Sequence, residues 1–171
     1  MKKLNVLFYK PRTFKGKIIE FFTGAKYSHV GIQLDEYHIF DIIGFSDVKI
    51  SHNNVNEEYY DRVSITLSDD QYELFHKKIN SFKNFEYDYL RALGVKNSDD
   101  KYTCYELVQH ILYDIGYLSK IKWVVLPEEL YNVLIRIEGS RIAKELKKNT
   151  NKCKNLFRDV KKEFYEEVNN E

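Results

Sequence analysis

A cysteine stands at the predicted start of a helix, in the segment Lys101–Val108. Thr103 is followed three residues later by Glu106, which is the T-x-x-E pattern of a capping box. Cys104 is then the first residue inside the helix. The unpaired backbone N–H groups and the positive end of the helix dipole favour an anion at that point. The pattern therefore predicts a reactive cysteine, because the thiolate is the nucleophilic form of the side chain.

The helix beyond this cysteine has one apolar side. Its apolar residues fall within a stripe about 140° wide at roughly 100° per residue, and Cys104 lies inside that stripe. They are Leu107, Val108, Ile111, Leu112 and Ile115. Gly116 is a suitable C-cap. We expect Cys104 to face the body of the protein; the alternative is a small buried apolar cysteine that happens to sit beside a cap.

A histidine lies on a predicted strand far earlier in the chain. The segment Tyr27–Leu34 alternates, with His29, Gly31 and Gln33 on one side and mostly apolar residues on the other. A single histidine on a strand is more often structural than catalytic. Here the glycine leaves room beside the imidazole, as glycine does where another group approaches a strand closely.

The strand predicted over Tyr37–Ile43 offers two polar partners for this imidazole, His38 and Asp41, which have opposite parity. A two-residue turn after Leu34 would put His38 on the face of His29. A three-residue loop would put Asp41 there instead. The spacing alone leaves both alternatives open.

Together these residues form a constellation for nucleophilic catalysis by a thiol. His29 would take the proton of Cys104 and later protonate the leaving group, while Asp41 or His38 would orient the imidazole. The backbone N–H of Cys104 would help to stabilise an oxyanion. The five histidines and two cysteines show no H-x-x-x-H or C-x-x-C spacing, and we therefore expect no metal site and no cofactor.

The remaining pattern predicts an α+β protein. Its 171 residues fit one catalytic domain over 1–138, followed by a charged helical extension over 139–171. The extension is expected to be a solvated helix, with self-association as the alternative. Besides the elements above, we expect strands at Asn5–Tyr9, Val48–Ile50, Arg62–Leu67 and Lys122–Leu126, helices at Lys15–Phe22, Gln71–Phe82 and from Pro127, and a packed loop or short helix at Phe85–Leu90.

Net charge and cysteine content indicate which partners and which cellular compartment to expect. Lys and Arg number 27 against 26 Asp and Glu, so nothing indicates a general electrostatic attraction to nucleic acid. Two cysteines form no disulfide framework, which favours a reducing compartment. The apolar run near the N-terminus is too short for a signal peptide or a membrane span, and we expect a cytoplasmic protein.

The order of these motifs resembles a known family, the circularly permuted NlpC-type papain-like proteins, which include YiiX-like and lecithin:retinol acyltransferase-like members. The resemblance covers roughly residues 4–131. Five segments are similar to the family's motifs in the same order: Tyr27–Ile32, Asp41 (where Glu is usual), Tyr87–Tyr89, Cys104–Val108 (with Tyr105 where Ser is usual) and Leu126–Leu130.

This resemblance implies a papain-like fold, in which a small antiparallel sheet or barrel packs against the helix that carries the cysteine. It implies a thiol hydrolase acting on an amide through Cys104, His29 and Asp41, with Asp41 preferred over His38 as the third member and Tyr102 lining the substrate site. The alternatives are a lipid esterase or acyltransferase on the same residues, and a binding module that has lost catalysis. Related sequences also occur in phages and viruses, so a host cytoplasm or a virion is a further expected setting.

Overall fold

The computed structural model describes residues 1–12, 17, 24–42, 48–82, 86–88, 101–119 and 126–168, and gives the backbone alone for Tyr87 and residues 151–168. This part of the chain is an α+β protein with a five-stranded antiparallel sheet and three α-helices. It divides into two compact units, Met1–Leu134 and Ile135–Glu171. The helix expected over Lys15–Phe22 and the strand expected over Lys122–Leu126 lie essentially outside the described residues.

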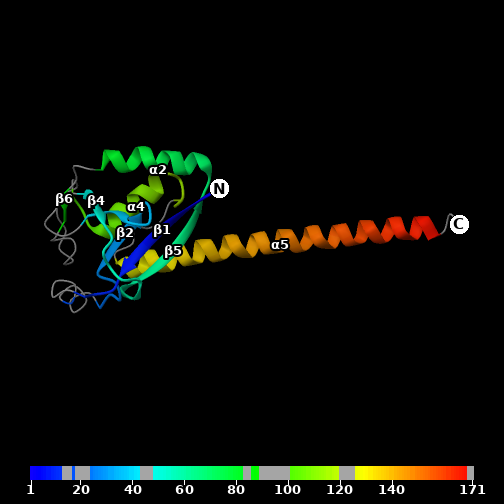
Figure 1. The fold of residues 1–171 in the computed structure, drawn as a ribbon, viewed down its shortest axis with the longest axis horizontal. Coiled ribbons are helices and arrows are strands. Elements are labelled where there is room, and N and C mark those ends of the chain that lie inside the picture. The colour runs from blue at the N-terminus through cyan, green and yellow to red at the C-terminus, as the bar shows by residue number, and fades with distance from the viewer. Residues whose placement is uncertain are drawn as a thin grey trace. The chain divides into compact units, whose positions relative to one another are not determined.

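The sheet consists of β1 (Lys2–Tyr9), β2 (His29–Gln33), β3 (His38–Ile42), β4 (Val48–His52) and β5 (Tyr60–Leu67). Its spatial order is β4-β3-β2-β1-β5, so the first strand of the chain lies between β2 and β5 (Figure 1). Each of these strands was expected from alternation or from a short apolar run, with ends that differ by at most three residues.

The hairpin between β2 and β3 settles the loop length that the sequence left open. Leu34 N–H donates to the carbonyl of His38 at 2.9 Å, and Ile32 pairs with Phe40, so three residues form the loop. The carboxylate of Asp35 accepts hydrogen bonds from the backbone N–H groups of Tyr37 and His38, each at 2.8 Å, which closes the loop as an Asx-type turn. Asp41 is therefore on the face of the sheet that carries His29.

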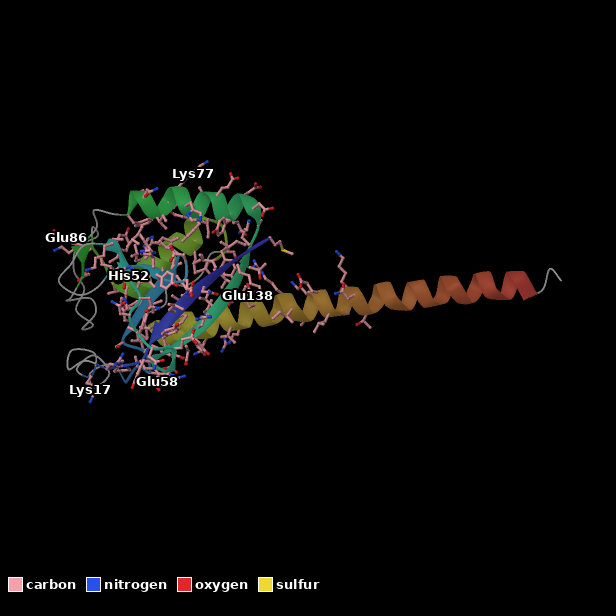
Figure 2. All side chains as sticks on the ribbon, viewed as in Figure 1. Lys17, His52, Glu58, Lys77, Glu86 and Glu138 are labelled. Atoms are coloured by element: carbon pink, nitrogen blue, oxygen red, sulfur yellow. The ribbon has the colours of Figure 1, made fainter. Side chains whose placement is uncertain are left out.

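Two capped helices cover the sheet. The helix α4 (Cys104–Asp114) packs against β2 and β3, and α2 (Asp69–Ser81) packs beside α4 (Figure 1). Both begin with a capping box in which the cap and the third residue exchange bonds, as expected for α4. Lys77 points away from the molecule on the outer side of α2 (Figure 2), whereas Phe75 of the same helix is buried.

The apolar stripe expected on α4 is buried. Leu107, Val108, Ile111 and Leu112 are fully enclosed, and Gly116 follows the helix with a positive φ of 68°. This left-handed conformation is the one that glycine adopts without steric cost after a helix C-terminus.

One prediction of local structure was wrong. Within Phe85–Leu90, where a loop or short helix was expected, β6 (Glu86–Tyr87) is a strand that pairs in parallel with β7 (Lys101–Tyr102). Asp88 continues this pairing, because its N–H donates to the carbonyl of Tyr102 at 2.9 Å. The pairing fixes the residue before the cap of α4.

The last helix, α5 (Pro127–Val168), begins at the expected proline. Within the first unit its opening turns bury Leu130 and Leu134, and the ring of Tyr131 packs edge-on against Phe8 with centroids 5.2 Å apart. As far as the structure describes it, the second unit is the rest of α5, which continues through Gly139 without a break.

Candidate active site

The imidazole of His29 is paired with a buried carboxylate. Its Nε2 lies 3.0 Å from Oδ2 of Asp41, whose side chain is fully enclosed. The other carboxylate oxygen, Oδ1, accepts a hydrogen bond from the hydroxyl of Ser51 at 3.2 Å. The side chain of His29 is 22% exposed and that of Asp41 is not exposed, so solvent contacts this pair only at the histidine.

The second partner of the imidazole is the side chain of Cys104. Burial lowers the pKa of His29. The hydrogen bonds with Asp41 and Cys104 and the charge interactions with both groups outweigh this effect, so the pKa rises to about 10. His29 is therefore an imidazolium at neutral pH, held between two groups that are anionic when ionised.

The strand register brings Asp41 to the imidazole, and Gly31 makes room for it. A Cβ at Gly31 would lie only 3.2 Å from the Cβ of Asp41, which is closer than ordinary side-chain contact. The glycine thus has the role that the sequence suggested, since it allows the carboxylate of the neighbouring strand to approach β2 closely.

The capping box holds the cysteine at the first position of α4. Thr103 N–H and Thr103 Oγ1 both donate to Oε2 of Glu106, at 3.0 and 2.9 Å, and Glu106 N–H donates back to Oγ1 at 3.4 Å. Cys104 is 3% exposed. The first N–H groups of a helix have no intrahelical acceptor, so this position offers donors to an anion that forms next to the sulfur.

His38, the other candidate for the third member, lies elsewhere. Its Nδ1 lies 2.9 Å from the carboxylate of Asp35, and its ring stacks on that of His52 with centroids 4.7 Å apart. Both rings project from the hairpin of β3 and β4, where His38 and His52 are paired across the strands. The structure therefore brings Asp41, and not His38, to His29.

Tyr102 lies two residues before the cysteine, at the end of β7. Its ring packs edge-on against His110 at 4.7 Å and against Phe82 at 6.1 Å between centroids. The side chain is half-buried. Its contribution to substrate binding stays a prediction.

Two neighbours of the His29–Asp41 pair were not anticipated. The ring of Tyr9 packs against His29 with centroids 5.4 Å apart, and its hydroxyl donates to Asn53 at 3.2 Å. Burial and the charge of Asp41 raise the pKa of Tyr9, so the phenol stays neutral. Ser51 is the other neighbour. Both lie on the face of His29 and Asp41, a relation that follows from the strand pairing and is visible in the sequence only once that pairing is known.

The chain just before β2 is fixed by an ionic cluster. The hydroxyl of the buried Tyr27 and the ammonium of Lys26 both donate to Asp61 on β5, at 2.5 and 2.9 Å, and Lys10 adds a third contact at 3.0 Å. Hydrogen bonds from Tyr27 and Lys26 hold the pKa of Asp61 well below its usual range. These bonds anchor the entry to β2 two residues before His29.

Within the described ranges, no three His, Cys, Asp or Glu side chains converge as a metal site requires. No described helix combines the length and apolar character needed to cross a bilayer. No model of a known protein family matches the chain, and neither does any curated protein.

Proposed function

We propose that the chain is a cysteine hydrolase that cleaves an amide bond, with Cys104 as nucleophile, His29 as acid and base, and Asp41 as the residue that orients and charges the imidazole. The observation that carries this proposal is the double engagement of one imidazole, by a buried carboxylate at 3.0 Å and by the thiol at the N-terminus of α4. A buried structural histidine has no need of both partners. The permuted NlpC-type papain-like fold is part of the proposal, supported by the chain order His29, Asp41, Cys104.

The proposed hydrolysis uses the charges of Cys104 and His29 in two steps. The thiolate of Cys104 attacks the carbonyl carbon, and the C=O electron pair moves to oxygen, where helix N–H donors stabilise the oxyanion. His29 then gives its proton to the leaving nitrogen, the C–N bond breaks, and an amine departs from a thioester on Cys104. Neutral His29 next takes a proton from water, the hydroxide displaces the thiolate, and the carboxylic acid leaves with the site restored.

The charged imidazole of His29 is compatible with an amide substrate. An amine leaving group must be protonated before the C–N bond breaks, and an imidazolium with a pKa of about 10 is fully charged at neutral pH. The hydrogen bonds with Asp41 and Cys104 favour this charge.

Alkylation by iodoacetamide at pH 6, followed by peptide mapping, tests the thiolate–imidazolium pair. An ordinary thiol is only about 0.3% ionised at that pH. We expect Cys104 of the native chain to react at least about tenfold faster than the same cysteine in urea-unfolded chain, because the imidazolium keeps the thiolate populated. His29→Gln should remove this advantage. A native rate no higher than the unfolded rate would refute the ion pair.

Hydrolysis is tested with a panel of acyl anilides and the matching acyl esters, read by product release and by intact mass. We expect an acyl group on Cys104 in the wild type and none in Cys104→Ser. Cys153→Ser is the matched control and should retain both signals. A wild-type chain whose thiol alkylates rapidly but never takes an acyl group from any member of the panel would instead identify a binding module.

A further inference from the structure

An aromatic ring, that of Tyr9, lies beside the imidazole of His29. The two residues are directly opposite each other on β1 and β2, and their ring centroids are 5.4 Å apart with 35° between the ring planes. Residues opposite each other in an antiparallel pair share one face of the sheet, where their side chains interact. The imidazole is therefore bordered by Asp41, by Cys104 and by this phenol ring.

The ring of Tyr9 also borders the carboxylate side of the site. A Cβ at Gly31 would lie 3.9 Å from the edge of this ring and 3.2 Å from the Cβ of Asp41, so the ring and the acidic residue adjoin the same bare stretch of β2. The charge of Asp41 acts on the phenol, because it contributes to the raised pKa of Tyr9. The ring thus occupies space that water would otherwise fill beside the pair.

The phenol of Tyr9 is itself fixed in place. Its hydroxyl donates to Oδ1 of Asn53 at 3.2 Å, and the N–H of Asn53 donates to a carbonyl of the loop between β2 and β3 at 2.8 Å. The side chain is only 7% exposed and belongs to a buried cluster whose other members are Leu7, Ile39 and Tyr60. The ring is therefore held by packing along its length and by a hydrogen bond at its tip.

We propose that Tyr9, anchored by Asn53, is a positioning residue of the proposed hydrolase. Its ring limits rotation of the His29 side chain and keeps water from the hydrogen bond between His29 and Asp41, so the imidazole stays aligned between that carboxylate and Cys104. The inference rests on the proposed function, because this alignment serves the transfer of a proton by His29. A displacement of about 1 Å at a reacting group can cost about a hundredfold in rate.

The ring supplies a contact that does not depend on the charge of the imidazole. In the proposed reaction His29 becomes neutral after it protonates the leaving amine, and its hydrogen bond with Asp41 then loses the strength that the charge gave it. Packing against Tyr9 is the same in both states, since it depends on shape and contact. At 7% exposure the phenol has little surface for a substrate, so its loss should act on kcat rather than on KM.

Kinetics of Tyr9→Leu, with Tyr60→Leu as the matched control, test the role. Tyr60 is opposite Tyr9 on the side away from His29, is 8% exposed, and packs against Tyr9 with centroids 5.5 Å apart. Both variants remove one buried ring and should lose similar stability in urea. On the acyl anilide of the panel that the wild type cleaves fastest, Tyr9→Leu should lower kcat at least about tenfold with KM within about twofold. Equal kcat in the two variants overturns the proposal.

An NMR titration of His29 in the same two variants separates positioning from a general loss of packing. The titratable groups that face the imidazole among the described residues are Asp41, Cys104 and Tyr9. Water admitted by Tyr9→Leu weakens the interactions that raise the pKa of His29, and these outweigh the effect of burial. We therefore expect the pKa to fall from about 10 by at least about half a unit, a threefold change, in Tyr9→Leu and to stay unchanged in Tyr60→Leu. A pKa that is unchanged in both overturns the proposal.

Tyr9→Phe keeps the test decisive if Tyr9→Leu does not fold, because it removes only the hydroxyl that Asn53 holds. It should lower kcat at least about threefold, whereas Tyr60→Phe should leave kcat unchanged. A Tyr9→Phe chain with the wild-type kcat overturns the anchoring role. A wild type that cleaves no anilide refutes the hydrolase function and the positioning role together, while a wild type that cleaves anilides and tolerates the loss of the phenol refutes only the latter.

Discussion

Replacing the buried carboxylate by an amide, Asp41→Asn, should favour the neutral form of the His29 imidazole. The side chain keeps its size, so the fold can be retained while the charge 3.0 Å from Nε2 is lost. The pKa of His29 stands at about 10 against an ordinary value of 6.5, a difference that corresponds to about 5 kcal/mol of preference for the charged form.

The carboxylate supplies much of that preference. An opposite charge this close shifts a pKa by about 1–3 units, and the hydrogen bond with Asp41 is the largest of the influences that raise it. We expect the pKa of His29 to fall by about 1–3 units in Asp41→Asn, which lowers the free-energy preference for the charged imidazole by about 1–4 kcal/mol. Part of the rise remains, because Cys104 still faces the ring.

Stability links to this pKa with a definite sign. A histidine whose pKa is higher in the folded chain than in the unfolded chain stabilises the fold fully below about pH 6.5. That contribution is lost as the pH rises through about 10. We therefore expect the wild type to lose more free energy of unfolding between pH 7 and pH 10 than Asp41→Asn does.

The measurement is an NMR titration of the histidine side chains, with His29 assigned by its loss in His29→Gln, together with urea unfolding at several pH values. Asp35→Asn is the matched control, because its amide oxygen can still accept from the N–H groups of Tyr37 and His38 while the charge that pairs with the His38 imidazole is lost, so His29 should be unchanged. If His29 of the wild type titrates near 6.5, or if Asp41→Asn leaves its pKa unchanged, the account of the site given above is wrong.

Three further substitutions have defined outcomes. Gly31→Ala should lower the free energy of unfolding by about 1–3 kcal/mol and reduce thiol alkylation at pH 6, because the new methyl group displaces the carboxylate of Asp41. Gly139→Ala is the contrasting change, because nothing lies within 4 Å of a Cβ at that position. It should stabilise the helix by about 0.5–1 kcal/mol in the same urea titration. Thr103→Ala and Ser68→Ala each remove a capping box and should cost about 1 kcal/mol, but only Thr103→Ala should also slow alkylation of the neighbouring thiol. Ser51→Ala leaves a buried carboxylate oxygen without its hydroxyl donor; it should cost about 1–3 kcal/mol by urea unfolding and lower the site histidine's pKa little, since the charge remains.

Local chemistry made the capped helix and the strands predictable. Thr103 and Glu106 bond as their spacing requires, and the apolar stripe beyond Cys104 is the buried side of α4. Such features depend on neighbours a few residues apart, so the sequence carries them directly. The two-residue strand β6 is too short to show a period, and it was missed for that reason.

The partner of the imidazole was harder to predict, because it depends on a loop. Two-residue and three-residue connections both fit the alternation of β2 and β3, and each brings a different polar residue to His29. The determining contact is the carboxylate of Asp35, which accepts from the N–H groups of Tyr37 and His38 and so closes three residues rather than two. Ser51 was missed for a similar reason, since its nearness to Asp41 follows from the pairing of β3 with β4.

The hairpin register also has a consequence for how this site can be lost. Phe40 and Ile42 are completely buried on the face of β3 opposite Asp41, and burying such side chains is worth about 1.5–3 kcal/mol each. A strand displaced by one residue would move both side chains out of this core and bring the acidic group into it. Folding and assembly of the site are thus one event, and shortening the Asp35–Tyr37 connection by a single residue would strain the loop or unfold the sheet instead of yielding a stable protein with a rearranged site.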